Sequence, residues 1–270
     1  MQRSSSLYTL GFAAAVCVVC AVLVSSSAYF LQGPQERNKV LDRQRHVLNV
    51  TGLADIGEAL SAAEVQQRFD AAIESRFVNI ETGEVLTPEA FREVTGLDPV
   101  TYDPREAVTM PERSTAAPAR NRAGVARLPI YERVYYVMED GEPAQIVLPI
   151  VGKGLWSTLY GFLALDRDTR TIRGITFYEH GETPGLGGEI DNPRWKEQWE
   201  GRKAYDEEGN PRIEVIKGVA GPPEEEPHKV DGLSGATLTA QGVSGLVQFW
   251  LSEAGFKPFL EQFRNQRSVA

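Results

Sequence analysis

The feature that most constrains this fold is a long uncharged stretch near the N-terminus. No Asp, Glu, Lys or Arg occurs between Arg3 and Glu36, and residues 7–31 supply 25 mostly apolar positions. A helix of this length is long enough to cross the hydrocarbon core of a bilayer, which is about 30 Å thick. We therefore predict a single-pass transmembrane anchor over residues 1–35.

Two other roles for this stretch are open. Ser26, Ser27 and Ala28 are small residues at a position where a signal peptide could be cleaved, but the apolar stretch is longer than the usual core of a signal peptide. A lipoprotein anchor is disfavoured because Val16 and Val19, rather than small residues, precede the two cysteines. A retained anchor is the favoured interpretation.

The charges on either side of the apolar stretch indicate on which side of the membrane the rest of the chain lies. Arg37, Lys39, Arg43 and Arg45 follow the apolar stretch, against Arg3 before it. By the positive-inside rule alone, this asymmetry would place the rest of the chain in the cytoplasm.

Composition excludes several classes of function. The net charge of −9 argues against a nucleic-acid partner. The only cysteines, Cys17 and Cys20, lie in the apolar stretch, so the remainder has no disulfide, cysteine metal site or cysteine nucleophile. The three histidines show no metal-ligand spacing. We predict no metal site and no catalytic side chain.

The rest of the chain has the pattern of an α+β protein. Residues 36–99 are expected to form a helical juxtamembrane appendage, with a capping box at Ser61–Glu64, a strand pair within 77–86 and a helix at 88–95. Residues 100–270 are expected to form one domain with an antiparallel sheet, after an irregular excursion over 96–127. Its predicted strands are 130–138, 145–151, 158–165, 171–178 and 213–217, and its predicted helices start at Asn192–Pro193, near 237 and near 256.

The string Asp231-Gly-Leu-Ser-Gly-Ala-Thr-Leu-Thr-Ala240 precedes an amphipathic run. Val243, Leu246, Val247, Trp250 and Leu251 share one helical stripe. Ser234 is expected to cap this helix, which puts Thr237 in its first turn. There the unpaired backbone N–H groups and the helix dipole favour a phosphate. Thr239 is expected on the helix surface.

The same string matches the pattern at which a flavin transferase attaches FMN to a threonine. Its fixed positions are filled by Asp231, Ser234, Gly235, Ala236 and Thr237. The alternative is that the string is only a well-capped helix start.

A second motif, Glu179–Glu189, holds four glycines and a proline and follows a predicted strand. Such a loop lets backbone approach a flat ligand closely. It lacks the strand, G-x-G-x-x-G and helix order of a dinucleotide fingerprint, so nothing in the sequence indicates NADH binding by this chain.

Together these motifs resemble one family. Gly152-Lys-Gly-Leu-Trp156, Glu182-Thr-Pro-Gly-Leu-Gly187, Ser234-Gly-Ala-Thr237 and the N-terminal stretch resemble the C subunits of the sodium-translocating NADH:quinone oxidoreductases. Asn38–Asp42 and Asn192–Pro193 extend the resemblance over nearly the whole chain. The G subunits of the related electron-transport complex share the FMN domain but are usually shorter between the anchor and that domain.

The resemblance implies a flavoprotein with FMN held by a phosphoester on Thr237. It implies an α+β fold in which a single N-terminal transmembrane helix precedes an antiparallel-sheet FMN-binding domain. Ser234, Gly235 and Ala236 would lie near the phosphate, Asp231 would assist the transferase, and Lys217 would neutralise negative charge. The residues expected to line the flavin ring are Leu155, Trp156, Glu182, Thr183, Pro184, Gly185, Leu186 and Gly187.

The simpler alternatives are a core role for Trp156, a turn role for Asp231 and a solvated Lys217. The function implied is electron relay within a redox-driven sodium translocase of the bacterial inner membrane. The resemblance places the C-terminal domain on the periplasmic side, against the charge rule above. The implied partners are the other membrane subunits and the flavin transferase. The alternatives are the FMN-bearing member of the ferredoxin:NAD electron-transport complex and a membrane-anchored binding or assembly module without redox function.

Overall fold

The computed structural model describes residues 6–268 and divides the chain into two compact units, 1–43 and 44–270. Helix α1, Ser6–Val50, contains a stretch, Tyr8–Gly33, that is long and apolar enough to cross a membrane. The side chains of this stretch are exposed, as a membrane-facing helix requires. Arg3, which enters the charge comparison, lies outside the described residues.

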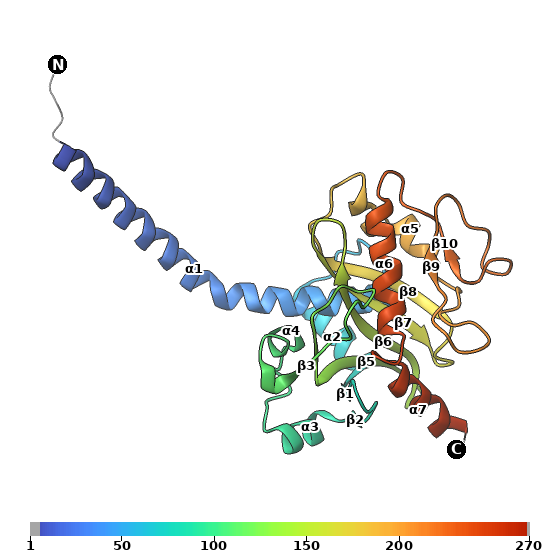
Figure 1. The fold of residues 1–270 in the computed structure, drawn as a ribbon. Helices are drawn as coiled ribbons and strands as arrows, with labels where there is room; N and C mark the ends of the chain where they lie inside the picture. The colour runs from blue at the N-terminus through green and yellow to red at the C-terminus, as the bar shows by residue number, and fades with distance from the viewer. Residues whose placement is uncertain (1–5, 269–270) are drawn as a thin grey trace. The chain divides into compact units, whose positions relative to one another are not determined.

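The second unit is built from a large sheet and helices (Figure 1). Its helices are α2 (Ala62–Ala72), α3 (Pro88–Thr95), α4 (Pro104–Ala107), α5 (Pro193–Glu197), α6 (Thr237–Trp250) and α7 (Lys257–Ser268), with 3-10 turns η1 (Pro111–Arg113) and η2 (Gly187–Asp191). Its strands are β1 (Ile73–Asn79), β2 (Val85–Leu86), β3 (Ser114–Ala116), β4 (Arg127–Pro129), β5 (Tyr131–Glu139), β6 (Glu142–Lys153), β7 (Thr158–Asp166), β8 (Ile172–Glu179), β9 (Glu214–Val215) and β10 (Lys229–Val230).

The main sheet has six antiparallel strands in the order β2-β1-β5-β6-β7-β8. The predicted hairpins β5–β6 and β7–β8 are confirmed, and so is the β1–β2 pair. β1 pairs with β5 along its full length, so the segment 36–99 contributes two strands to the sheet as well as helices. The functional boundary near residue 100 stays a prediction.

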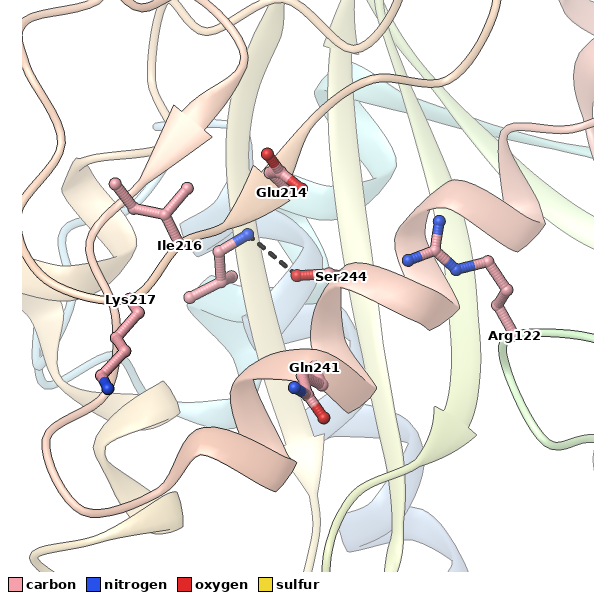
Figure 2. Close-up of a pocket in the computed structure, with 7 residues that line it drawn as sticks. Arg122, Glu214, Ile216, Lys217, Gln241 and Ser244 are labelled. Carbon is pink, nitrogen blue, oxygen red and sulfur yellow. Dashed lines mark hydrogen bonds between the residues drawn. The ribbon is translucent and has the colours of Figure 1, made fainter.

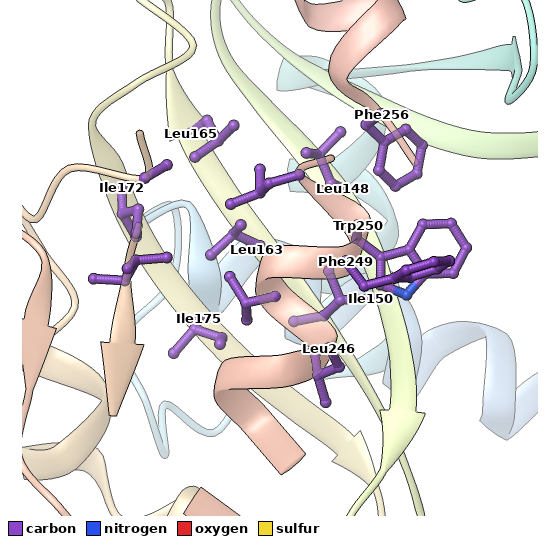
Figure 3. Packing of buried hydrophobic residues seen from close by; sticks show 14 of the residues in the cluster. Leu148, Ile150, Leu163, Leu165, Ile172, Ile175, Leu246, Phe249, Trp250 and Phe256 are labelled. Atoms are coloured by element: carbon purple, nitrogen blue, oxygen red, sulfur yellow. The ribbon is translucent and has the colours of Figure 1, made fainter. Parts of the chain in front are cut away.

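Helix α6 packs its apolar stripe on one face of this sheet (Figure 3). Leu246, Phe249 and Trp250 meet sheet residues such as Leu148, Ile150 and Leu163 in one buried cluster. The helix pitch brings positions 246 and 250 to the same face, and strand alternation turns 148 and 150 toward it. Burial of this stripe fixes which side of α6 faces solvent.

Local signals explain several element boundaries. Ser61 and Glu64 form the predicted capping box of α2, and Asn192 caps α5 as expected. Three expectations were wrong in extent. The strand expected at 213–217 is only β9, the last helix, expected over about 256–263, is α7 and ends at Ser268, and the excursion 96–127 contains α4, η1 and β3.

The end of α1 belongs to the core of the second unit. Val47 and Leu48 are fully buried, and His46 Nδ1 lies 3.2 Å from Thr176 Oγ1. We expect a chain starting at Gln44 to keep its folded stability, whereas one starting at Thr51 loses these buried side chains. Each fully buried aliphatic side chain contributes about 1.5–3 kcal/mol. Urea unfolding followed by circular dichroism checks this, and equal midpoints for the two fragments would contradict it.

Candidate functional site

The start of α6 displays Thr237 to solvent. Gly235 has φ +71°, a left-handed conformation that favours glycine, and the Ala236 N–H donates to the Leu233 carbonyl at 3.1 Å. This turn makes Ala236 the residue before the helix, so the expected cap by Ser234 is wrong. Thr237 is the first helical residue and is exposed.

Among the described residues, no side chain caps the first turn of α6. The first backbone N–H groups of a helix lack intrahelical partners, and they lie beside the Thr237 hydroxyl. An uncapped, exposed helix start is where a phosphate group gains most from the amides and the dipole. The site therefore fits a phosphate linked to this threonine.

Thr239 was expected on the surface, but it is fully buried. Its position is one helical turn before Val243, so the apolar stripe of α6 extends back to it and turns it toward the sheet. Its hydroxyl donates to Glu182 Oε2 at 2.6 Å.

Glu182 joins the two sequence motifs. Its carboxylate accepts backbone N–H groups of Leu155, Trp156 and Ser157 at 3.3, 2.9 and 3.1 Å, as well as the Thr239 hydroxyl. The side chain is only 5% exposed. Both oxygens are engaged with protein donors, so the structure places Glu182 behind the loop surface.

The environment of Glu182 favours its charged form. Burial raises the pKa of this carboxyl, but the hydrogen bonds from Thr239 and three backbone amides outweigh burial. The pKa is therefore lowered from its ordinary value.

Glycines make this close arrangement fit. A Cβ on Gly187 would lie 2.6 Å from Thr239 Oγ1 and 2.7 Å from Glu182 Oε2, and one on Gly154 would lie 2.5 Å from Glu182 Oε1. Any other residue at these two positions would displace the carboxylate.

Large apolar side chains around this cluster are exposed. Trp156 is 72% exposed, and Leu155, Leu186 and Leu238 are also exposed. A core role for Trp156 is therefore wrong. Thr183, Pro184 and Gly185 are exposed on the same loop as Leu186, whereas Gly187 is buried.

The glycine-rich loop meets the threonine motif at Leu186. A Cβ on Gly235 would lie 2.9 Å from Leu186 Cδ2. Exposed apolar surface beside an uncapped helix start fits a flat aromatic ligand that carries a phosphate.

Asp231 holds the turn before α6. Its Oδ1 accepts the Ala220 N–H at 2.7 Å, its carbonyl accepts Trp195 Nε1–H at 2.9 Å, and its N–H donates to Gln198. These contacts give it the turn role that was one alternative. Assistance to a transferase stays a prediction.

Lys217 was expected to neutralise negative charge at the site. It is exposed and lines a cavity of about 360 Å³ between β9 and α6, together with Arg122, Gln241 and Ser244 (Figure 2). Ser244 Oγ accepts the Val215 N–H across this gap. The carbonyl of Gly218, next to Lys217 in the chain, accepts the Gly232 N–H at 2.8 Å, so Lys217 flanks the early part of the threonine motif.

Thr239, Ser157 and Leu238 were not predicted as members of this site. The apolar stripe that begins at Val243 contained the signal for Thr239, since position 239 lies four residues, or about one helical turn, before it. Ser157 Oγ accepts the Gly181 N–H at 2.7 Å, a contact between distant loops that no local pattern encodes.

The exposure of Trp156 gives a stability prediction. We expect Trp156→Ala to change the free energy of unfolding by less than about 0.5 kcal/mol. Trp250→Ala should cost about 3–5 kcal/mol, because Trp250 is buried and its Nε1–H donates to the Val151 carbonyl. Urea unfolding followed by far-ultraviolet circular dichroism measures both. A large loss for Trp156→Ala would contradict its placement on the surface.

The comparisons with known proteins agree with this geometry. A family model described as FMN-binding domain matches residues 154–252, which include both motifs. The C subunit of the Na(+)-translocating NADH-quinone reductase from Yersinia pestis is 45% identical over 92% of this chain and 90% of that protein. Its counterpart from Pseudomonas aeruginosa is 43% identical over 97% of this chain and 98% of its own length.

Solved structures give the same result. The crystal structure of Shewanella oneidensis NqrC has a TM-score of 0.73 and 32% identity, covering 86% of this chain and 99% of that one. The crystal structure of the corresponding reductase subunit from Parabacteroides distasonis has a TM-score of 0.60 and 28% identity, covering 85% of this chain and 96% of that one. With relatives this similar over nearly their full lengths, the chain belongs to the NqrC family, the C subunits of the Na(+)-translocating NADH-quinone reductases.

Proposed function

We propose that this protein carries FMN in a phosphoester bond to Thr237 and relays electrons within the reductase complex. The observation that most supports this proposal is the exposed Thr237 at an uncapped helix start, beside an apolar surface that includes Trp156 and Leu186. The FMN-binding domain match over 154–252 supports the cofactor. When bound, FMN supplies the redox chemistry, and the protein supplies its position and electrical environment.

A covalent tether suits a relay. A cofactor that cannot dissociate does not need an enclosing pocket, and Thr237, Trp156 and Leu186 are exposed. We propose that one edge of the flavin remains open toward partner subunits, which carry the sodium-moving machinery. We also propose that the domain lies on the periplasmic side of the inner membrane, where the attaching transferase works, with Tyr8–Gly33 as the anchor.

The test is intact and peptide mass spectrometry of protein made with a flavin transferase. We expect an added mass of one FMN less one water, mapped to the peptide that contains Thr237. Unmodified protein from cells in which the transferase modifies another substrate would overturn the proposal, and would favour a membrane-anchored module without redox function.

A further inference from the structure

Among the residues that the structure describes, Glu182 is the acidic side chain that connects all three parts of the proposed site. It sits on the glycine-rich loop, accepts three consecutive backbone amides of the turn Gly154–Ser157, and accepts the Thr239 hydroxyl from α6. These three segments carry the exposed Leu186, Trp156 and Thr237 respectively.

We propose that Glu182 is a positioning residue that holds these three segments together as one flavin-binding surface without itself touching the flavin. This deepens the proposed function and rests on it. The carboxylate is buried and its two oxygens accept four hydrogen bonds of 3.3 Å or shorter, so it acts through the loop and the helix. These donors are neutral amides and a neutral hydroxyl.

All these donors need an accepting oxygen, so the two oxygens of the Glu182 carboxylate decide whether they are satisfied. A carboxylate offers two accepting oxygens, whereas a glutamine amide offers one oxygen and one NH₂ group. In Glu182→Gln the NH₂ group would face either the Trp156 and Ser157 amides or the Leu155 amide and the Thr239 hydroxyl. At least one backbone N–H of the turn would then lose its acceptor, because an NH₂ group cannot accept it. Thr239→Val removes the hydroxyl donor at nearly the same volume, while Thr239→Ser retains it.

Two readouts test this on the full chain. The first is visible circular dichroism of the attached flavin, which reports how rigidly its surroundings hold it. The second is time-resolved fluorescence anisotropy of tryptophan in flavin-free protein. Of the four tryptophans, Trp195, Trp199 and Trp250 are buried, so fast local motion reports on Trp156.

We expect Glu182→Gln and Thr239→Val to lose most of the flavin dichroism and to gain fast motion of Trp156. Thr239→Ser should match the wild type. Glu189→Gln is the matched control, since Glu189 lies in the same loop region and its Oε2 accepts the Asn192 Nδ2–H at 2.8 Å, a contact within three residues of the chain. If Glu182→Gln and Thr239→Val fold and show the same flavin dichroism and the same tryptophan anisotropy decay as the wild type, the proposal is overturned.

The outcomes separate this inference from the proposed function. If the wild type carries no flavin, the proposed function fails, and Trp156 anisotropy in the flavin-free variants still decides whether Glu182 holds the turn. If Glu182→Gln does not fold, Thr239→Val decides, because it removes one hydrogen bond and leaves the three backbone amides bound to Glu182.

Discussion

Thr237→Ala should leave the whole protein population without covalent flavin, even when the transferase is abundant. The substitution removes the only side-chain oxygen at that position to which a phosphoester can form. Thr237 is exposed and makes no cap to the helix, so the fold should be unaffected. The measurement is intact mass spectrometry beside a thermal unfolding curve.

The control for this experiment is Thr183→Ala. Thr183 is another exposed threonine, on the neighbouring glycine-rich loop, and its loss should leave the added FMN mass on the Thr237 peptide. If Thr237→Ala protein still carried one FMN, the attachment site would be elsewhere and the role proposed for the α6 start would be wrong. Thr239 is not an alternative acceptor, because it is fully buried and already donates to Glu182.

Periodicity predicted most of the sheet. The β5–β6 and β7–β8 hairpins followed from alternation broken by short polar turns, and the α2 capping box followed from Ser61 and Glu64. The pairing of β1 with β5 was not predictable, because these strands are far apart in the chain and nothing local specifies their register. Short elements such as β9 depend on tertiary contact, here the Ser244 bond to Val215.

The site was predictable as a set of motifs but not as an assembly. The string 231–240 placed Thr237 correctly in the first helical turn, yet it misplaced the cap because Gly235 forms a turn that delays the helix. Glu182 was expected to line the ligand, but its contacts lie with Thr239 and the turn amides. Those contacts depend on how α6 sits on the sheet, which side-chain burial over the whole domain decides.

Gly242 shows how closely α6 approaches the sheet. A Cβ at this position would lie 2.4 Å from the Lys153 carbonyl oxygen and 3.3 Å from Gly154 Cα. Both are backbone atoms, so no side-chain rotation relieves the clash. Helix propensity alone favours alanine over glycine by about 1 kcal/mol, so propensity and packing predict opposite signs.

We expect packing to win, with Gly242→Ala destabilising the fold by about 2 kcal/mol. Overpacking of this kind costs about 1–3 kcal/mol, and a backbone clash at 2.4 Å belongs near or above the upper end, against the smaller gain in propensity. Gln241→Ala is the control, because Gln241 is exposed on the same helix. Urea unfolding of both variants measures the difference, and a stabilised Gly242→Ala would show that α6 is not held this close to the sheet.

The close approach of Gly242 to the Lys153 carbonyl links the stability of the fold to the proposed flavin site. Lys153 and Gly154 lead into the turn whose amides bind Glu182, so a helix pushed away at Gly242 also moves Thr239 away from that carboxylate. Gly242→Ala should therefore lower the unfolding midpoint and the flavin dichroism together, whereas Trp250→Ala, at the far end of the helix, should act first on the midpoint. Unchanged flavin dichroism in a destabilised Gly242→Ala protein would separate the packing of α6 from the position of its first turn.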